Sequence, residues 1–219
     1  MTATENSHML NNNRKQKLLY LEFSLTFLFL PGAIYMKLLP LPKFSVLIML
    51  SIFAMTIVLS KREVYKKNLL SFKINPTTQK KIVKRFLVLI PAVFILSAIL
   101  TPSQLFRYPV KEPINWVLTA PIYSLFSALP QEILYRVFFF QRYKPIFRKK
   151  STLFLANALA FSFLHIIYNN PVAPILSFAG GYLFSSTYND TGSLPITALE
   201  HSIYGYFIFT AGLGQIYFM

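Results

Sequence analysis

The sequence predicts an all-α membrane protein, a polytopic bundle of about seven spanning helices. Of its 219 residues, 54% are hydrophobic and only 13% are charged, whereas soluble domains carry about 25% charged residues. Lys and Arg exceed Asp and Glu by 22 to 7, which gives a net charge of +15. A soluble nucleic-acid-binding protein would be polar as well as basic, so this class is excluded. The absence of cysteine excludes a disulfide scaffold, a thiolate metal site and a cysteine nucleophile.

Seven apolar stretches are long enough to be considered, because a bilayer core takes about 20 mostly apolar residues per helix. They are residues 18–39, 44–60, 86–106, 114–140, 152–168, 172–188 and 194–218. The fifth and sixth are separated only by Asn169-Asn170-Pro171, which predicts a tight hairpin turn. Gly212 and Gly214 predict a bend near the end of the seventh.

The domain organisation expected from these stretches has three parts. Residues 1–17 form a polar cytoplasmic head, residues 18–110 form three N-terminal membrane helices with a basic cytoplasmic loop, and residues 111–219 form a helical core. No small-residue cleavage site follows the first apolar stretch, so we expect a retained anchor and not a signal peptide.

The distribution of Lys and Arg predicts the orientation of the chain. With a cytoplasmic N-terminus, seventeen of these residues lie inside and four lie outside, and the remaining one, Arg136, lies within a helix. The positive-inside rule therefore favours a cytoplasmic N-terminus and an outside C-terminus. The basic loops also predict contact with anionic lipids. We expect a multi-pass protein of a prokaryotic inner membrane.

Ionisable residues inside the apolar stretches need an explanation, because one charge at mid-bilayer costs about 2.5–3.5 kcal/mol on insertion scales. Such residues are Glu22, Glu132, Arg136, His165, Glu200 and His201. Glu22 is expected at the interface near the basic head. The other five fall in only three of the stretches, which predicts a shared polar cavity.

The spacing within this group suggests chemistry. Glu132 and Arg136 are four residues apart, so they lie on one helical face as an ion pair. Such a pair could also serve only to neutralise a helix for insertion. His165 and His201 together with a carboxylate would suffice to bind Zn²⁺, and they would equally suffice to activate a water without metal. Neither histidine belongs to an H-E-x-x-H helix, so the zincin arrangement is absent.

Three short motifs resemble those of the CPBP (Abi) family. Pro130-Gln131-Glu132-Ile133-Leu134-Tyr135-Arg136 is similar to the E-E-x-x-x-R motif, and Phe161-Ser162-Phe163-Leu164-His165 matches F-x-x-x-H. The third motif, H-x-x-x-N, is approached by His201-Ser202-Ile203-Tyr204-Gly205. The family comprises intramembrane proteases related to the type II CAAX prenyl endopeptidases and to bacteriocin-processing and immunity proteins. The resemblance covers about residues 114–209 and makes residues 111–219 a CPBP-like catalytic core.

Two residues depart from the family pattern. Gln131 stands at the first Glu, which in the family activates a water together with the His of the second motif. Gly205 stands at the Asn, which in the family holds the oxyanion together with the last His. A carboxamide does not take up a proton near neutral pH, so Gln131 can position a water but cannot act as a base. Either Glu132 takes over this role, or Glu200 supplies the missing carboxylate, or hydrolysis is lost.

The resemblance implies an intramembrane endopeptidase, of a glutamic or a metal-dependent type, that acts on a peptide or protein in or at the membrane. We expect Glu132 and His165 to activate a water, Arg136 to fix Glu132, and His201 to stabilise the oxyanion. Zn²⁺ is the cofactor that Glu132, His165 and His201 would hold if the enzyme is metal-dependent. The alternative is a non-hydrolytic membrane protein on the same scaffold, with a role in bacteriocin immunity, substrate holding or transport.

Overall fold

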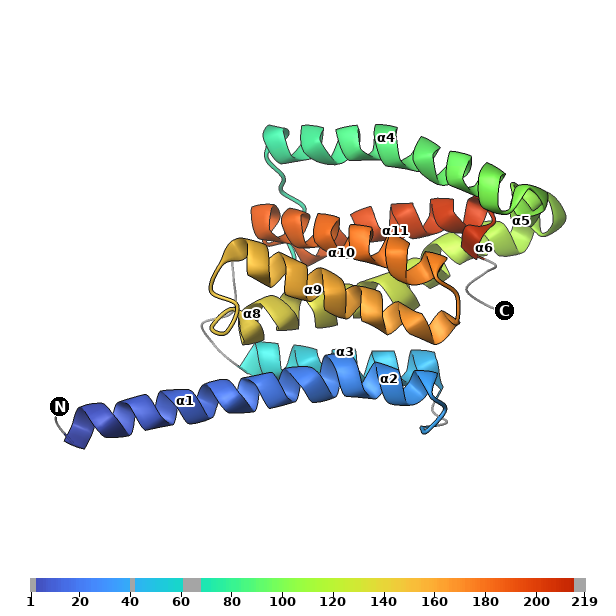
Figure 1. Cartoon of the computed structure of the whole chain (residues 1–219). Helices are drawn as coiled ribbons and strands as arrows, with labels where there is room; N and C mark the ends of the chain where they lie inside the picture. The colour runs from blue at the N-terminus through green and yellow to red at the C-terminus, as the bar shows by residue number, and fades with distance from the viewer. Residues whose placement is uncertain (1–2, 40–41, 61–67, 215–219) are drawn as a thin grey trace.

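The computed structural model describes residues 3–39, 42–60 and 68–214, and within these ranges the chain is helical and contains no strand. Consecutive elements join into long helical segments that run back and forth across the molecule (Figure 1). In chain order the elements are α1 Ala3–Ser24, η1 Leu25–Phe29, α2 Leu30–Tyr35, α3 Lys43–Ser60, α4 Pro76–Leu100, η3 Pro102–Gln104, α5 Arg107–Lys111, α6 Pro113–Tyr123, η4 Ser124–Ala128, α7 Leu129–Glu132, η5 Ile133–Phe138, α8 Phe139–Tyr143, α9 Lys150–Leu164, η6 His165–Tyr168, α10 Val172–Thr191 and α11 Leu194–Thr210.

The all-helical class predicted from the sequence is confirmed for the described residues, whereas the number of membrane spans is not. Three described helices are long and apolar enough to cross a membrane, namely Asn13–Tyr35, Pro76–Leu100 and Lys150–Tyr168. A fourth, Ser45–Ser60, is apolar but shorter. Helices that pack against other helices need not be apolar on every side, because they do not face lipid all round.

Two helices begin earlier than their apolar stretches. The first helix already begins at Ala3, so the polar residues up to Lys17 continue into it as helical turns. α4 begins at Pro76 and not near residue 86, because the Asn75 side chain accepts a hydrogen bond from the Thr78 backbone N–H at 2.8 Å. Proline at the first position of a capped helix is favourable. Hydropathy alone does not detect these polar first turns.

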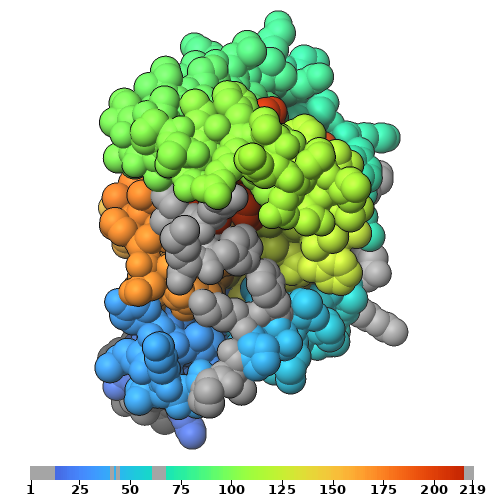
Figure 2. All heavy atoms as spheres, turned by 90° about the vertical axis from the view of Figure 1, so that its right-hand side faces the viewer, coloured from blue at the N-terminus to red at the C-terminus, as the bar shows by residue number. Residues whose placement is uncertain are grey.

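α11 lies at the centre of the helical arrangement. It contacts α4, α5, α6, α7 and α10. At the end of the molecule seen in Figure 2, the α4–α5 region covers the top, α10 lies on the left and α6 on the right. The helix that carries His201 is therefore enclosed by its neighbours.

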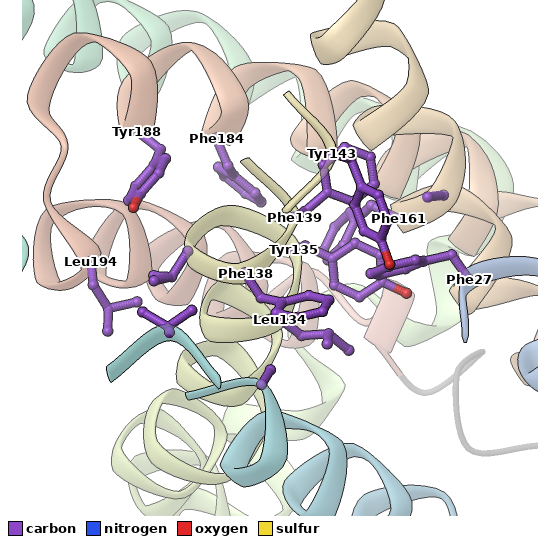
Figure 3. Packing of buried hydrophobic residues seen from close by; sticks show 14 of the residues in the cluster. Phe27, Leu134, Tyr135, Phe138, Phe139, Tyr143, Phe161, Phe184, Tyr188 and Leu194 are labelled. Carbon is purple, nitrogen blue, oxygen red and sulfur yellow. The ribbon is translucent and has the colours of Figure 1, made fainter. Parts of the chain in front are cut away.

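A cluster of aromatic side chains joins the first helix to the helix that carries Glu132. Phe27 is fully buried, and its ring centroid lies 5.1 Å from that of Tyr135 and 5.3 Å from that of Phe139 in edge-to-face contacts. Figure 3 shows these rings beside Tyr143 and Phe161. Aromatic pairs in such geometry contribute about 0.5–1.5 kcal/mol each beyond the burial of their area. The packing therefore holds the motif helix in a rigid position.

Glu22, expected at the interface, is bound to the end of this same helix. Its carboxylate accepts a hydrogen bond from Arg142 Nε at 2.8 Å and one from the Tyr143 hydroxyl at 3.0 Å. The contact adds a polar clamp next to the aromatic cluster.

The connections on either side of α10 are short and follow from their residues. Asn169 has a positive φ of 56°, and the Asn170 side chain accepts a hydrogen bond from the Ala173 N–H, as the predicted hairpin turn requires. Gly192, with φ 65°, ends α10, and the Ser193 hydroxyl accepts a hydrogen bond from the first turn of α11. α11 and α9 are thereby held side by side with α10.

The predicted bend near the C-terminus also occurs. α11 ends at Thr210, and Gly212 has φ 87°. A Cβ atom at residue 212 would lie 2.2 Å from the Gln104 carbonyl oxygen, so the close approach requires glycine. The remaining residues 215–219 of the seventh stretch lie outside the described residues.

The basic segments lie at one end of the molecule. In Figure 1 the N-terminal end of α1, the start of α4 and the turn between α8 and α9 all lie on the left. If this end is cytoplasmic, a reporter that is active only in the cytoplasm gives signal when fused after Lys67 and none when fused after Lys111. Reporter activity in cells checks this, and the reverse pattern would contradict the orientation. Lys67 itself lies outside the described residues.

An ion pair fastens α4 to α10 at the same end. Lys81 Nζ lies 2.8 Å from Asp190 Oδ2. Burial by itself raises the pKa of Asp190, but hydrogen bonds from Lys81 and Asn189 and the charges of Lys81 and Lys150 outweigh burial and lower the pKa below 3.8. A lowered carboxyl pKa stabilises the fold above the unfolded value, and this contribution disappears as the pH falls through the folded value.

We therefore expect Asp190→Asn to lower the free energy of unfolding at pH 7 by less than about 1 kcal/mol, because the pair is partly exposed. The difference from the unmodified protein should vanish at pH values well below 3.8. Thermal unfolding in detergent between about pH 2 and 7 measures both. A difference that persists unchanged at the acidic end would contradict the ion-pair explanation.

Candidate active site

The helix that carries the first motif is not a regular α-helix. Between α6 and α8 the chain forms two π-helical turns, Ser124–Ala128 and Ile133–Phe138, on either side of the short α7. Pro121 and Pro130 lack the N–H that a regular ladder requires, and π turns are frequent at functional sites. In this segment Gln131 faces the cavity described below, and Glu132 is buried behind it.

Glu132 bridges His201 and Arg136. Its Oε1 lies 2.8 Å from His201 Nδ1, and its Oε2 lies 3.2 Å from Arg136 Nε. Both the Glu132 and the Arg136 side chains are completely buried. A carboxylate without a proton only accepts hydrogen bonds, so His201 Nδ1 carries the proton in this contact. The ion pair expected from the four-residue spacing is present, and its acid also orients His201.

A layer of polar side chains supports Arg136 from behind. Arg136 Nη1 donates to Asn157 Oδ1 at 3.0 Å, and the Ser185 hydroxyl donates to the same oxygen at 2.8 Å. The guanidinium also lies over the rings of Phe161 and Phe184, with 4.8 and 5.4 Å to their centroids. The cation–π contacts, the hydrogen bond to Asn157 and the ion pair with Glu132 offset part of the loss of water around this buried charge, while Nη2 has no hydrogen-bond partner in the protein.

His165 lies at the end of α9 and is 7% exposed, so it does not point to lipid. Its Nδ1 lies 2.7 Å from the Phe161 backbone carbonyl. A carbonyl oxygen only accepts, so Nδ1 carries the proton and Nε2 has a free lone pair. The rings of His165 and His201 both pack against Phe161, with centroid distances of 4.8 and 5.5 Å.

A cavity of about 220 Å³ lies between α4, α6–α7, α9, α10 and α11. Gln131, His165 and His201 line it, whereas Glu132 and Arg136 do not. Most of the wall is apolar, and its other residues are Leu89, Ala92, Val93, Leu96, Tyr123, Ser127, Phe161, Tyr168, Leu176, Ser177, Ala179, Gly180, Leu183, Phe184, Tyr204, Gly205, Ile208 and Phe209. The expectation that Glu132 contacts a water in the cavity therefore differs from the observed geometry.

Gln131 has one free hydrogen-bonding atom at this cavity. Its Nε2 donates to the Ser127 hydroxyl at 2.9 Å, while its buried Oε1 has no hydrogen-bond partner in the protein. A buried acceptor without a partner costs about 1–3 kcal/mol, so a water or a substrate N–H is favoured there.

In the cavity wall, the Tyr123 ring fills the space that a side chain at residue 205 would occupy. A Cβ atom at residue 205 would lie 2.2 Å from Tyr123 Cε1 and 2.5 Å from its hydroxyl oxygen. The Tyr123 hydroxyl lies 3.0 Å from His201 Nε2. The glycine at the position of the family Asn therefore makes room for a tyrosine from a different helix.

Gly205→Ala should lower the free energy of unfolding by about 1–3 kcal/mol, because the added methyl group overlaps the Tyr123 ring. Gly32→Ala is the matched control, since its Cβ would meet only Phe163 at 3.9 Å and alanine favours a helix by up to about 1 kcal/mol. Unfolding in detergent measures both variants. In a Tyr123→Ala background the cost of Gly205→Ala should disappear, and a cost that stays the same would contradict the overlap.

Glu200 does not supply a carboxylate to the cavity. It is buried, and its Oε1 lies 3.3 Å from Arg85 Nη1 on α4. Arg85 also donates to the Thr187 hydroxyl at 3.0 Å. Glu200 therefore fastens α4 to α11, which leaves it outside the cavity wall.

A zinc site made of Glu132, His165 and His201 does not fit this geometry. Within the part of the chain that the structure describes, no group of three or more His, Asp or Glu side chains could hold a metal ion. Glu132 is directed at His201 Nδ1 and Arg136 and away from the cavity that His165 lines.

Three residues of the site were missed because they carry no charge. Asn157 and Ser185 are buried polar residues within apolar helices, and a polar residue in such a stretch was the available signal. No sequence feature near Tyr123 predicted its role, because its contact partner His201 is 78 residues away. The glycine at the position of the family Asn was the available sign that another side chain could fill this space.

Comparison with known families supports the resemblance noted from the motifs. Residues 113–207 match the family model described as type II CAAX prenyl endopeptidase Rce1-like. No curated protein and no solved structure matches the chain. The matched range contains all three motifs and each cavity residue discussed above except those of α4 and the end of α11.

Proposed function

Residues 113–207 belong to the type II CAAX prenyl endopeptidase Rce1-like family, and from this premise we propose that the chain is an intramembrane endopeptidase. The observation that supports the proposal is that Gln131, His165 and His201, which come from three different helices, line one cavity. Glu132, Arg136, His165 and His201 would together cost on the order of 10 kcal/mol if each were isolated within a bilayer, so an arrangement in which they serve one site is favoured.

The substrate we propose is a membrane-associated peptide, with a prenylated CAAX end as the first candidate. The cavity wall is mostly aliphatic and aromatic, which suits an apolar peptide segment or part of a lipid chain. The few polar groups on it could fix the orientation of one peptide bond.

In the proposed reaction a water is held between the free Gln131 Oε1 and His165 Nε2. His165 Nε2 takes a proton from this water while the water oxygen forms a bond to the carbonyl carbon of the peptide. The C–N bond then breaks, and the proton on His165 passes to the leaving amine. Gln131 positions the water and His165 is the base, because Gln131 cannot take up a proton.

His201 would act on the other side of the peptide bond, next to the carbonyl oxygen. Glu132 fixes the orientation of its ring through the 2.8 Å contact to Nδ1, and Arg136 fixes Glu132. A hydrogen-bond donor held beside the His201 ring would stabilise the charge that develops on the carbonyl oxygen.

The test is cleavage of a prenylated CAAX peptide by the purified protein in lipid nanodiscs. His165→Ala should lower kcat by about 10²–10⁴-fold, because the base is lost. The matched control is Leu155→Ala on the exposed face of the same helix, which should leave the rate unchanged. The proposal fails if the unmodified protein leaves the peptide intact, or if His165→Ala cleaves it equally fast.

A non-hydrolytic protein that holds the peptide is the second candidate, and one observation favours it. Gln131 stands where a carboxylate would take up the proton of the water. Binding of the peptide without cleavage, measured in the same nanodiscs, would support this candidate over the endopeptidase.

A further inference from the structure

We infer that Tyr123 is a further catalytic residue, whose hydroxyl donates a hydrogen bond to the carbonyl oxygen of the substrate as negative charge develops there. This inference rests on the proposed function and names a group for the oxyanion side of the same cavity. Tyr123 lies at the end of α6 and, like His201, lines the cavity.

The position of the hydroxyl is tightly determined. Its oxygen lies 3.0 Å from His201 Nε2, and the tyrosine ring meets the rings of His201 and Phe209 edge-to-face at 5.9 and 5.2 Å. Gly205 allows the ring this close approach, because any side chain at residue 205 would overlap it. The hydroxyl is thus held at the cavity wall by contacts to three residues of α11.

The proton positions make the tyrosine the donor. His201 Nδ1–H donates a hydrogen bond to Glu132 Oε1, so neutral His201 has only a lone pair at Nε2 and accepts from the Tyr123 hydroxyl. In this state His201 has no proton to offer a carbonyl oxygen. When a carbonyl enters, the hydroxyl can turn its proton to it.

The position of Tyr123 explains why residue 205 is a glycine and not the Asn of the family motif. The tyrosine hydroxyl oxygen lies 2.5 Å from the place of a Cβ at residue 205, so it occupies the space where an Asn side chain would begin. A donor is therefore kept in this part of the cavity, although residue 205 itself has no side chain to supply one. His201 is then a positioning residue that acts through Tyr123.

The test uses Tyr123→Phe, which keeps the ring against Gly205 and removes only the hydroxyl. Two measurements in nanodiscs are made on a prenylated CAAX peptide: its cleavage rate, and the Kd of its phosphinate analogue, in which a tetrahedral phosphorus with anionic oxygens replaces the scissile amide. Tyr206→Phe is the matched control, since Tyr206 stacks on Trp116 and does not line the cavity.

We expect Tyr123→Phe to lower kcat by about 10²–10³-fold with little change in KM, and to weaken phosphinate binding while binding of the amide peptide stays the same. Unchanged kcat and unchanged phosphinate affinity would overturn the inference and leave the proposed hydrolysis intact. If the unmodified protein cleaves nothing, the proposed function fails, and the phosphinate Kd of Tyr123→Phe still decides the role of the hydroxyl.

Discussion

Replacing Gln131 by glutamate should raise the rate of peptide hydrolysis, because a second proton acceptor then stands beside His165. The gain should be at most the factor of about 10²–10⁴ that a positioned general base contributes. The side chain is nearly isosteric, and its free Oε1 already faces the cavity without a partner. A carboxylate there could take the proton that the carboxamide cannot. Cleavage of the prenylated CAAX peptide in nanodiscs measures the gain.

Gln79→Glu is the matched control for this change. It introduces the same chemical difference at an exposed position near the start of α4, far from the cavity wall. Cleavage by Gln131→Glu alone, with none by the unmodified protein, would favour the peptide-holding role for the natural chain. A Gln131→Glu variant that is no faster than the unmodified protein would contradict the placement of the water at residue 131.

Arg136→Met should lower the free energy of unfolding by about 3–5 kcal/mol, because it leaves the buried Glu132 carboxylate without its cation. Both side chains have no exposed surface, so water cannot replace the lost partner. The Asn157 oxygen loses its bond to the guanidinium as well. Methionine fills much of the arginine stem, so the loss reflects charge more than volume.

The double variant Glu132→Gln with Arg136→Met separates the ion pair from the packing. Removing both charges should recover most of the stability that Arg136→Met loses, since no unpaired charge remains. Arg142→Met is a control at a partly exposed pair with Glu22, where the cost should be about 1 kcal/mol or less. Unfolding in mixed micelles gives all these values. Equal losses in the single and the double variant would contradict a dominant charge effect.

The sequence predicted the elements of this fold better than their ends. Apolar stretches located the helices, and Asn169-Asn170-Pro171 located a turn, because both signals are local. The start of α4 was placed about ten residues too late, because its first turns are rich in lysine and are stabilised by the Asn75 cap, a signal that hydropathy ignores. The number of spans stayed open because enclosed helices such as α11 need not be apolar.

Charge and residue spacing in the sequence predicted only part of the candidate site. The four-residue interval correctly paired Glu132 with Arg136, and the rarity of ionisable groups singled out both histidines. The direction of the Glu132 carboxylate towards His201 was not predictable, because it depends on how two helices 69 residues apart in sequence pack. The contact of Tyr123 with Gly205 and the ion pair of Glu200 with Arg85 were not predictable either, because both also depend on how helices distant in sequence pack.

Isotope transfer from water tests the central proposal most directly. The purified protein in nanodiscs is incubated with a prenylated CAAX peptide in water enriched in ¹⁸O, and the products are weighed by mass spectrometry. Attack by a water in the cavity predicts a new C-terminal carboxylate that carries one ¹⁸O atom, formed by the unmodified protein and lost in His165→Ala. An intact peptide after prolonged incubation, or labelled product that forms equally in His165→Ala, would contradict hydrolysis at this site.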